Sequence, residues 1–253
     1  MIFSKKLSKF PQIKHGFFNK MGGKSKDIYK SLNCGMGSSD LKKNVANNLK
    51  IVSKKIGISP NKLILLNQVH SKKKIFIKKN YKFNKIKLKG DALITNAKHI
   101  ALGILTADCA PILIYDNNKR IISAIHAGWK GAYKGIIKSV IKFFIKKGSK
   151  PEDLIAVIGP CILQNNYEVQ KDFKYKFIKK DRQNKLFFKK KKNKTYFSLN
   201  KYIFYQLKKL GIKNLELINK DTFIEKNNFF SARRSISKNE NDYGRNISII
   251  MIN

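Results

Sequence analysis

The sequence predicts a single domain, residues 1–253, of the mixed α/β (α+β) class. Hydrophobic residues make up 42% of the 253 residues, with 17 Phe and 10 Tyr, which is enough for a sizeable core. Short apolar or alternating runs typical of strands are interspersed with stretches whose apolar residues recur every three or four positions, as in helices. The chain has no internal repeat and no linker that divides it. These observations favour one mixed domain over a bundle or an all-β protein.

The N-terminal part of the chain is expected to begin with a strand at residues 15–19. A helix is predicted from an N-cap at Asp40 to about Ile56, and Gly57 is expected to end it. Its apolar residues Val45, Leu49, Val52 and Ile56 share one helical face. Three further strands are predicted at residues 63–69, 74–78 and 92–95.

The central part has the most apolar segment, residues 100–115, in which Asp108 is the only charged residue. In so lysine-rich a chain this indicates burial on both faces. Residues 116–119 predict a turn and residues 120–126 a returning strand, so the two form a hairpin. A helix is predicted at about 133–144, ended by Gly148 and Pro151, and a buried strand at 154–158. Residues 171–194, with five lysines between 189 and 194, are expected to form a solvated loop or insertion.

The charge is strongly unbalanced, because 55 Lys and Arg residues against 15 Asp and Glu give a formal net charge of +40. Only five of the cations are Arg, and the lysines are scattered through every segment. Base readout and bidentate phosphate contacts favour Arg, so we expect no specific nucleic-acid partner. The joint enrichment of Lys, Asn and Ile indicates a bias toward A/T-rich codons. The alternative is a polyanion-binding accessory protein with a vestigial site.

Three cysteines, Cys34, Cys109 and Cys161, cannot all pair and show no paired spacing, which indicates a reducing compartment. The N-terminus lacks the features of a signal peptide, and no apolar run approaches the ~20 residues that span a bilayer. The sequence therefore predicts a cytoplasmic protein without a membrane segment.

The most unusual residues are two of the four histidines and one cysteine. His70 and His126 each end an apolar strand, and Cys109 follows Asp108 in the most buried segment. One thiolate and two imidazoles are a ligand set for zinc that leaves a fourth position open, as in catalytic zinc sites. The same three residues also fit a Cys nucleophile with a His base and no metal. Sequence order does not separate these two interpretations.

Other residues are candidates for supporting roles. Asp108, next to a proposed ligand, is a candidate proton carrier or partner of the metal ligands. Arg233 and Arg234 are candidate phosphate ligands, or else form ion pairs with acidic residues. They lie in a segment expected to be a strand, where alternation points them to opposite faces and favours Arg233 as the one in the site. The Gly/Ser loop that begins at Asn33 is a further candidate anion site.

Five motifs in order resemble those of the YfiH-type proteins, once called polyphenol oxidases or laccases. They are Asn67-Gln-Val-His-Ser71, Thr106-Ala-Asp-Cys-Ala-Pro111, His126-Ala-Gly-Trp-Lys-Gly131, Gly159-Pro-Cys-Ile162 with Asn166-Tyr-Glu-Val169, and Phe230-Ser-Ala-Arg-Arg234 with Tyr243-Gly-Arg245. The resemblance covers residues 15 to 250. Asn47-Asn48 departs from the Asn-Arg pair usual in the family, which leaves the substrate preference open.

The resemblance implies that His70, Cys109 and His126 bind zinc. It implies a single layered sandwich of mixed β-sheets flanked by helices, similar to the deamidase domain of cytotoxic necrotizing factor toxins. It also implies a zinc-dependent purine nucleoside phosphorylase with adenosine deaminase and methylthioadenosine phosphorylase activity, whose partners are purine nucleosides and phosphate. An alternative within the family is a hydrolase that edits peptidoglycan precursors.

Overall fold

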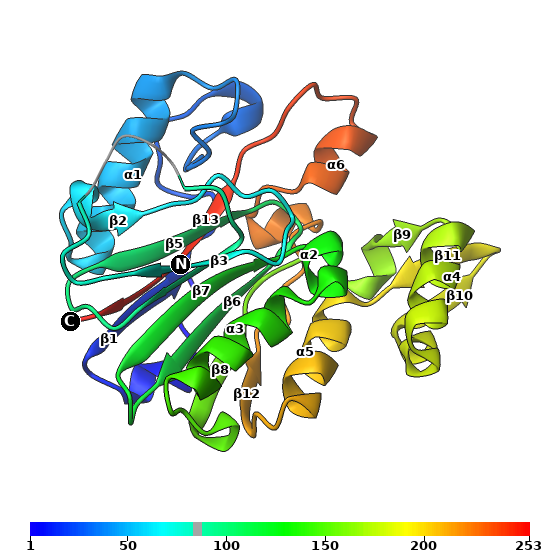
Figure 1. The fold of residues 1–253 in the computed structure, drawn as a ribbon. Coiled ribbons are helices and arrows are strands. Elements are labelled where there is room, and N and C mark those ends of the chain that lie inside the picture. Colours follow the sequence, from blue (N-terminus) through cyan, green and yellow to red (C-terminus); the bar gives the residue numbers. More distant parts are fainter. Residues whose placement is uncertain (83–87) are drawn as a thin grey trace.

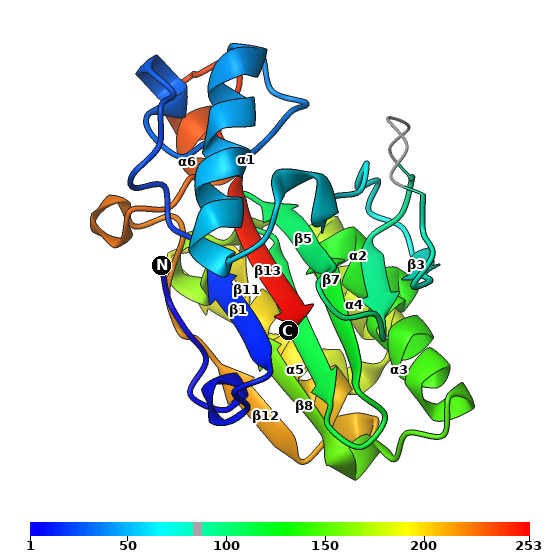
Figure 2. The same ribbon diagram turned by 90° about the vertical axis from the view of Figure 1, so that its left-hand side faces the viewer.

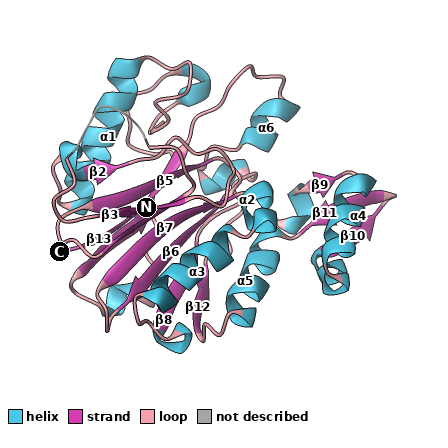
Figure 3. Cartoon of the chain, in the orientation of Figure 1, coloured by secondary structure: helices cyan, strands magenta, loops and turns pink. Residues whose placement is uncertain are grey.

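The computed structural model describes residues 1–82 and 88–253, which form two large mixed sheets, one small sheet and flanking helices (Figures 1 and 3). The largest sheet has the order β12 (Asn214–Leu217), β8 (Leu154–Ile158), β6 (Ala110–Asp116), β7 (Ile121–Ala127), β4 (Ala92–Thr95) and β3 (Lys74–Ile77). The second has the order β1 (Ile13–Phe17), β13 (Asn246–Ile252), β5 (Ala101–Thr106) and β2 (Leu63–Ile64). Both sheets combine parallel and antiparallel pairs, so the predicted mixed class is confirmed.

The two large sheets pack face to face. The alternation along β13 shows the layering, because Ile250 and Ile252 belong to the core between the sheets while Ile249 and Met251 belong to the core on the opposite face. Leu102 of β5 and Leu113 of β6 meet in the same inter-sheet core. The fold is therefore a layered sandwich with the helices outside.

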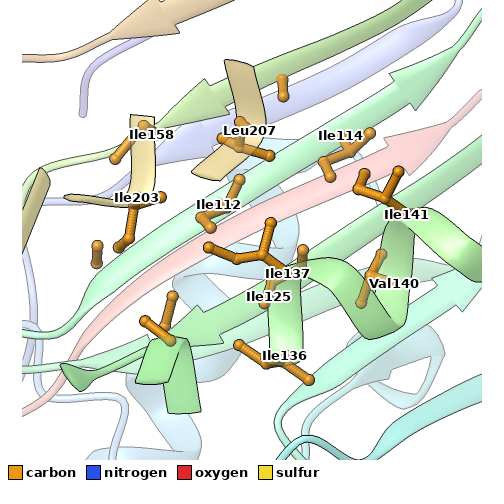
Figure 4. Close-up of a cluster of buried hydrophobic side chains, with 14 of the residues drawn as sticks. Ile112, Ile114, Ile125, Ile136, Ile137, Val140, Ile141, Ile158, Ile203 and Leu207 are labelled. Carbon is orange, nitrogen blue, oxygen red and sulfur yellow. The ribbon is translucent and has the colours of Figure 1, made fainter. Parts of the chain in front are cut away.

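Helices cover the outer faces of both sheets. α2 (Trp129–Lys134), α3 (Ile136–Lys146) and α5 (Leu199–Lys209) cover the six-stranded sheet. Figure 4 shows the buried aliphatic side chains of α3 and α5 against those of β6, β7 and β8. α1 (Lys42–Ile56) covers the four-stranded sheet (Figure 2). Its residues Val52 and Ile56 pack in one cluster with residues of β5 and β13. This arrangement places α1 and α3 on opposite sides of the molecule.

Most of the predicted helix boundaries are confirmed, with two differences. Gly57 ends α1 in the left-handed conformation at φ 80°, but Asp40 is not the N-cap, which is Leu41. The Asp40 carboxylate instead accepts hydrogen bonds from Ser25 and Asn33, so tertiary contacts take the place of a cap. The helix expected at 133–144 is two helices, because Gly135 at φ 92° separates α2 from α3.

The strand predictions are confirmed except at residues 63–69 and at the first strand, which is Ile13–Phe17 and begins and ends two residues before the predicted 15–19. The hairpin predicted around residues 116–120 is formed by β6 and β7, with Asp116 opposite Ile121. Only Leu63–Ile64 are in a strand of the predicted 63–69 segment. The remainder leaves the sheet and becomes the loop that carries His70, so the strand prediction there was too long. Among the described residues, no helix is long and apolar enough to cross a membrane.

The prediction of a loop at residues 171–194 is wrong. This segment contains α4 (Lys171–Lys180), a 3-10 helix (Arg182–Phe187) and strand β10 (Phe188–Lys191), which pairs with β11 (Lys194–Phe197) and, through it, with β9 (Glu168–Val169). A cluster of aromatic rings holds the unit together, including Phe173 stacked on Phe177 with centroids 4.7 Å apart. The unit projects from the two sheets in Figure 1. The prediction of a single domain stays a prediction.

Candidate metal centre

The fold brings His70, Cys109 and His126 together from three separate elements. β6 and β7 are antiparallel neighbours in which Pro111 lies opposite His126. Cys109 precedes β6 by one residue, so this register places its side chain beside the end of β7. His70 arrives from the loop after β2, with its backbone in the left-handed region at φ 54°.

The three side chains have the separations of a metal ligand set. One candidate ligand atom from each residue lies within 4.8 Å of the others, and Cys109 Sγ is 3.7 Å from His70 Nε2. A tetrahedral zinc with bonds of about 2.3 Å to sulfur and 2.0 Å to nitrogen separates such atoms by about 3.6 Å. The His70 and His126 rings meet edge to face, with centroids 4.7 Å apart. The donor set and its spacing therefore fit zinc.

Asp91, which no sequence motif singled out, organises both histidines. The residue is fully buried at the start of β4, and its Oδ1 accepts a 2.8 Å hydrogen bond from His126 Nδ1. The same carboxylate accepts from the backbone amides of Val69, His70 and Ser71 and from the Ser71 hydroxyl. Because Nδ1 of His126 is engaged, Nε2 is the nitrogen left for a metal.

The ionisation of these groups follows from their proximity. Burial opposes ionisation of the Cys109 thiol, but the charge of His126 and hydrogen bonds with His126 and His70 lower its pKa to about 6. Burial lowers the pKa of His126, whereas the Cys109 thiolate and the Asp91 hydrogen bond raise it to about 9. Burial also opposes ionisation of Asp91, but hydrogen bonds from His126 and Ser71 lower its pKa to about 2. Cys109 thus has the thiolate character of a ligand or a nucleophile.

Gly128 leaves the room that the cluster needs. A Cβ atom at this position would lie 2.7 Å from Cys109 Sγ and 2.9 Å from His70 Cδ2. The backbone conformation at Gly128 is ordinary, with φ −69°, so the constraint is the close approach and not the dihedral angle. A glycine between β7 and α2 therefore allows the side chains of Cys109 and His70 to lie against the backbone.

A cavity of about 560 Å³ opens onto the three side chains. Its walls include Gln68, Thr106, Tyr243, Arg245 and the loop residues 35–37. Gln68 is fixed by two hydrogen bonds to the backbone of Leu105, at 2.7 and 2.8 Å. The volume lies in the range of small-molecule sites. Polar groups of defined orientation thus surround a reactive cluster at the base of a cavity.

Asn33 lies behind this cavity and links two of its walls. Its Oδ1 accepts hydrogen bonds from the amides of Gly35 and Arg245, each at 2.9 Å. Its Nδ2 donates to Ser38 and Asp40. Asn33 is fully buried, so its visible role is to hold the glycine loop against Arg245. Arg245 in turn pairs with Asp242 at 2.9 Å.

Asp108 points away from the three clustered side chains although it precedes Cys109. Its carboxylate accepts from the Thr222 hydroxyl at 2.7 Å and from the Arg233 amide at 2.6 Å. Burial raises its pKa, while hydrogen bonds from the Arg233 amide, Thr222 and Ser231 oppose that rise. The residue anchors the start of α6 (Ala232–Ser237). A role for Asp108 in proton transfer stays a prediction.

The arginines of the C-terminal motif have different surroundings. They lie in helix α6, so the prediction that they belong to a strand and alternate between its faces is wrong. The guanidinium group of Arg234 donates to the carbonyl groups of Thr222, Phe223 and Phe229. Arg233 stacks on the Tyr167 ring, with its Cζ 5.3 Å from the centroid, and lines a second cavity of about 450 Å³ with Trp129.

Known proteins are similar to this chain along its whole length. The sequence profile of the family described as multi-copper polyphenol oxidoreductase laccase matches residues 14–253. A purine nucleoside phosphorylase of Rickettsia conorii is 36% identical over 81% of this chain and 86% of that protein. A purine nucleoside phosphorylase of Haemophilus influenzae is 33% identical over 95% of each chain. The crystal structure of the hypothetical protein YfiH of Bacillus licheniformis superposes with a TM-score of 0.90 at 29% identity, covering 97% of this chain and 94% of that one.

Proposed function

The chain belongs to the family described as multi-copper polyphenol oxidoreductase laccase, and we propose that it is a zinc-dependent purine nucleoside phosphorylase. The observation that carries the proposal is the cluster of His70, Cys109 and His126 at the base of a cavity of about 560 Å³. The names of the relatives from Rickettsia conorii and Haemophilus influenzae support the reaction class. Adenosine deaminase and methylthioadenosine phosphorylase activities at the same site, and a cytoplasmic location, belong to this proposal.

The ligand set favours zinc over the copper of the family's description. A multicopper oxidase needs more imidazole ligands than this chain offers, because it has four histidines in all. Of the other two, His15 accepts a hydrogen bond from the Ser4 amide, and His99 follows Lys98, which bridges to the end of β13. Zinc held by His70, Cys109 and His126 would supply Lewis-acid chemistry to the cavity.

The protein's own residues would bind and orient the two substrates of phosphorolysis. A nucleoside would occupy the cavity with its polar edges against Gln68, whose amide is already fixed to the backbone. Phosphate needs a cation beside the ribose, and Arg245 is the arginine that lines this cavity. Asn33 would act by holding Arg245 and the glycine loop in place. Asp91 would keep the His126 imidazole in one orientation.

Arg233 and Arg234 differ as candidate phosphate ligands. Arg233 remains a candidate from the neighbouring cavity, where its guanidinium lies over Tyr167. Arg234 donates to three backbone carbonyl groups, which favours a structural role for it. The phosphate site that we propose therefore centres on Arg245, with Arg233 as its alternative.

The experiment is a product analysis with inosine, adenosine and methylthioadenosine, each with and without inorganic phosphate. We expect free base and ribose 1-phosphate (or its methylthio analogue) only when phosphate is present, and ammonia from adenosine independently of phosphate. Release of base without phosphate would contradict phosphorolysis and indicate a nucleosidase. No turnover of any of the three by zinc-replete protein would contradict the proposal as a whole.

A second candidate is a metal-free thiol hydrolase, such as an editing enzyme for peptidoglycan precursors. It is favoured by one observation, the order Asp91, His126 and Cys109, in which an orienting carboxylate, a base and a nucleophile follow one another. Removal of metal by a chelator distinguishes the two candidates. Full hydrolytic activity in metal-free protein, lost on alkylation of Cys109, would favour the thiol mechanism over zinc.

A further inference from the structure

A groove lined mainly by lysines lies beside the loop that carries His70. It has a volume of about 620 Å³, and its walls come from residues 71–74 on one side and from α2 and α3 on the other. Its lysines are Lys72, Lys73, Lys74, Lys134, Lys138 and Lys142. The other lining residues are Ser71, Gly135 and Ser139, so no carboxylate lines it among the described residues. From this groove we infer a binding site for the phosphate backbone of single-stranded nucleic acid, without sequence preference.

The groove differs from the rest of this basic surface. Three of the other described cavities have acidic residues in their walls, such as Glu152 and Asp153 in one and Glu168 and Asp172 in another, while the cavity at the metal centre has no acidic residue but only one arginine and no lysine. None of the six lysines of the groove belongs to an ion pair in the described part of the chain. Six positive charges around one groove raise the electrostatic potential there, and a bound anion would lower it.

Two of the lysines are held in place by the protein. Lys74 Nζ donates to the Ser139 hydroxyl at 3.0 Å, a contact that joins strand β3 to helix α3 across the floor of the groove. Lys134 Nζ lies 3.3 Å from the carbonyl oxygen of His70. Fixed ammonium groups lose less side-chain entropy on binding a phosphate than free ones.

The spacing along α3 suits a chain of phosphates. Lys138 and Lys142 are four residues apart, and Lys146 continues the same row. The backbone positions of successive lysines are therefore separated by about 6 Å along one face of the helix. A stacked strand carries one phosphate every ~3.4 Å, so the row provides about one lysine for every two phosphates. A single small anion would use only part of this row.

Two aromatic rings, which follow groove residues on β3 and α3, favour single-stranded over double-stranded nucleic acid as the ligand. Phe76 follows Lys74 on the same side of β3, and Phe143 follows Ser139 by one turn of α3. The two rings are half-buried with centroids 5.3 Å apart, and Lys147 lies over both. Partly exposed rings beside a basic groove are the usual platform for unpaired bases. Lysine ammonium groups act as flexible point charges and lack the planar fork of arginine, which is why we infer no sequence preference.

The test compares two double variants with the same change of charge. Lys138→Glu/Lys142→Glu alters the groove, and Lys50→Glu/Lys54→Glu alters an exposed i,i+4 pair on α1, on the opposite side of the molecule. Each pair lowers the net charge from +40 to +36, because each Lys→Glu replacement removes two units. Circular dichroism and thermal unfolding check that both proteins fold. Binding of a labelled 12-nucleotide oligo(dT) is measured by fluorescence anisotropy over a series of NaCl concentrations.

We expect the groove variant to bind at least about tenfold more weakly at 0.1 M salt, and the α1 variant to change less than threefold. The slope of log K against log salt should become about 1.4 less negative in the groove variant only, since each lost phosphate contact in a single strand accounts for about 0.7. Equal weakening in both variants would overturn the inference, because binding would then follow the overall charge. Tighter binding to a 12-base-pair duplex, or displacement by millimolar inorganic phosphate, would overturn it as well. The inference would also be overturned if the groove variant lost binding to anionic lipid vesicles but still bound the oligonucleotide as the wild type does.

Discussion

Asp91 Oδ1 and His126 Nδ1 lie 2.8 Å apart, and both residues are buried. This contact fixes the imidazole so that its other nitrogen faces Cys109 and His70, while the remaining bonds of the same carboxylate shape the loop that carries His70. One acidic side chain therefore sets the position of two candidate ligands that are 56 residues apart in the sequence. Removing its charge is the sharpest test of how the site is organised.

Replacing Asp91 by Asn should weaken zinc binding by about 10- to 100-fold, because partners of metal ligands contribute by that amount. It should also destabilise the fold by about 1–3 kcal/mol, since backbone amides lose a charged acceptor. Zinc competition with a chromogenic chelator and urea unfolding measure the two effects. Ser71→Ala is the control, because it removes one of the donors and leaves the carboxylate. Equal zinc affinity in Asp91→Asn and wild type would show that the contact does not position the ligand.

Gly128→Ala should abolish metal binding without unfolding the protein. The added Cβ would lie 2.7 Å from Cys109 Sγ, so the thiol or the backbone has to move. Gly37→Ala is the matched control, because a Cβ at that position of the same cavity meets no atom within 4 Å. Metal analysis and thermal unfolding of both proteins test this. A Gly128→Ala protein that retains its full zinc content would contradict the packing argument.

Arg245→Lys should raise the KM for phosphate by about tenfold or more and leave ammonia release from adenosine unchanged. Lys keeps the charge but removes the planar group that binds phosphate with two hydrogen bonds. Arg234→Lys should lower the thermal stability with no selective effect on phosphate, because its guanidinium holds three carbonyl groups. If Arg233→Lys alone shows the selective loss, the phosphate site lies in the neighbouring cavity beside Tyr167.

Much of the fold follows from local patterns in the sequence. Some elements are determined by residues close together in the sequence, so they can be predicted from local patterns. Examples are the apolar stripe of α3, the nearly uncharged segment of β5 and β6, and the glycine that ends α1. The unit at residues 171–197 was missed because its lysines outnumber the apolar residues. Phe173 and Phe177, four residues apart, were the signal for a helix there.

The clustering of the three candidate ligands was predictable from the sequence, but the residues around them were not. His70, Cys109 and His126 stand out by residue type, and the family motifs strengthen that choice. Asp91 does not, because its role depends on contacts with residues 35 positions away on β7 and 21 positions away at His70. The one local signal was an isolated acid at the start of a buried strand in a chain with only 15 acidic residues. At Arg233, too, one contact comes from far away in the sequence, because its amide donates to Asp108, 125 residues earlier.

Glu216 gives the fold a pH-dependent contact outside the site. Its carboxylate accepts from the Ser4 hydroxyl and from the amides of Lys5 and Lys6. Burial opposes its ionisation, but these hydrogen bonds lower its pKa below 4.5. A lowered pKa means that the stabilisation is complete above pH 4.5 and disappears as the pH falls through the folded-state value.

Glu216→Gln should therefore cost about 1–2 kcal/mol at pH 7 and much less at about pH 3. Urea unfolding of variant and wild type at both pH values measures the difference. Glu152→Gln, at an exposed residue, is the control and should be neutral at both. A penalty that stays constant between pH 7 and pH 3 would mean that the ionised carboxylate is not what stabilises the N-terminal segment.

The most direct test of the central claim is the metal content of the purified protein and of its Cys109→Ser variant, measured by plasma mass spectrometry after equal exposure to zinc and copper under reducing conditions. We predict up to one zinc per chain in the wild type, little copper, and loss of the zinc in the variant, because the thiolate is one of the three candidate ligands that the described residues bring together. Full zinc retention by the Cys109→Ser protein, or copper in place of zinc in the wild type, would contradict the assignment of His70, Cys109 and His126 as a zinc site.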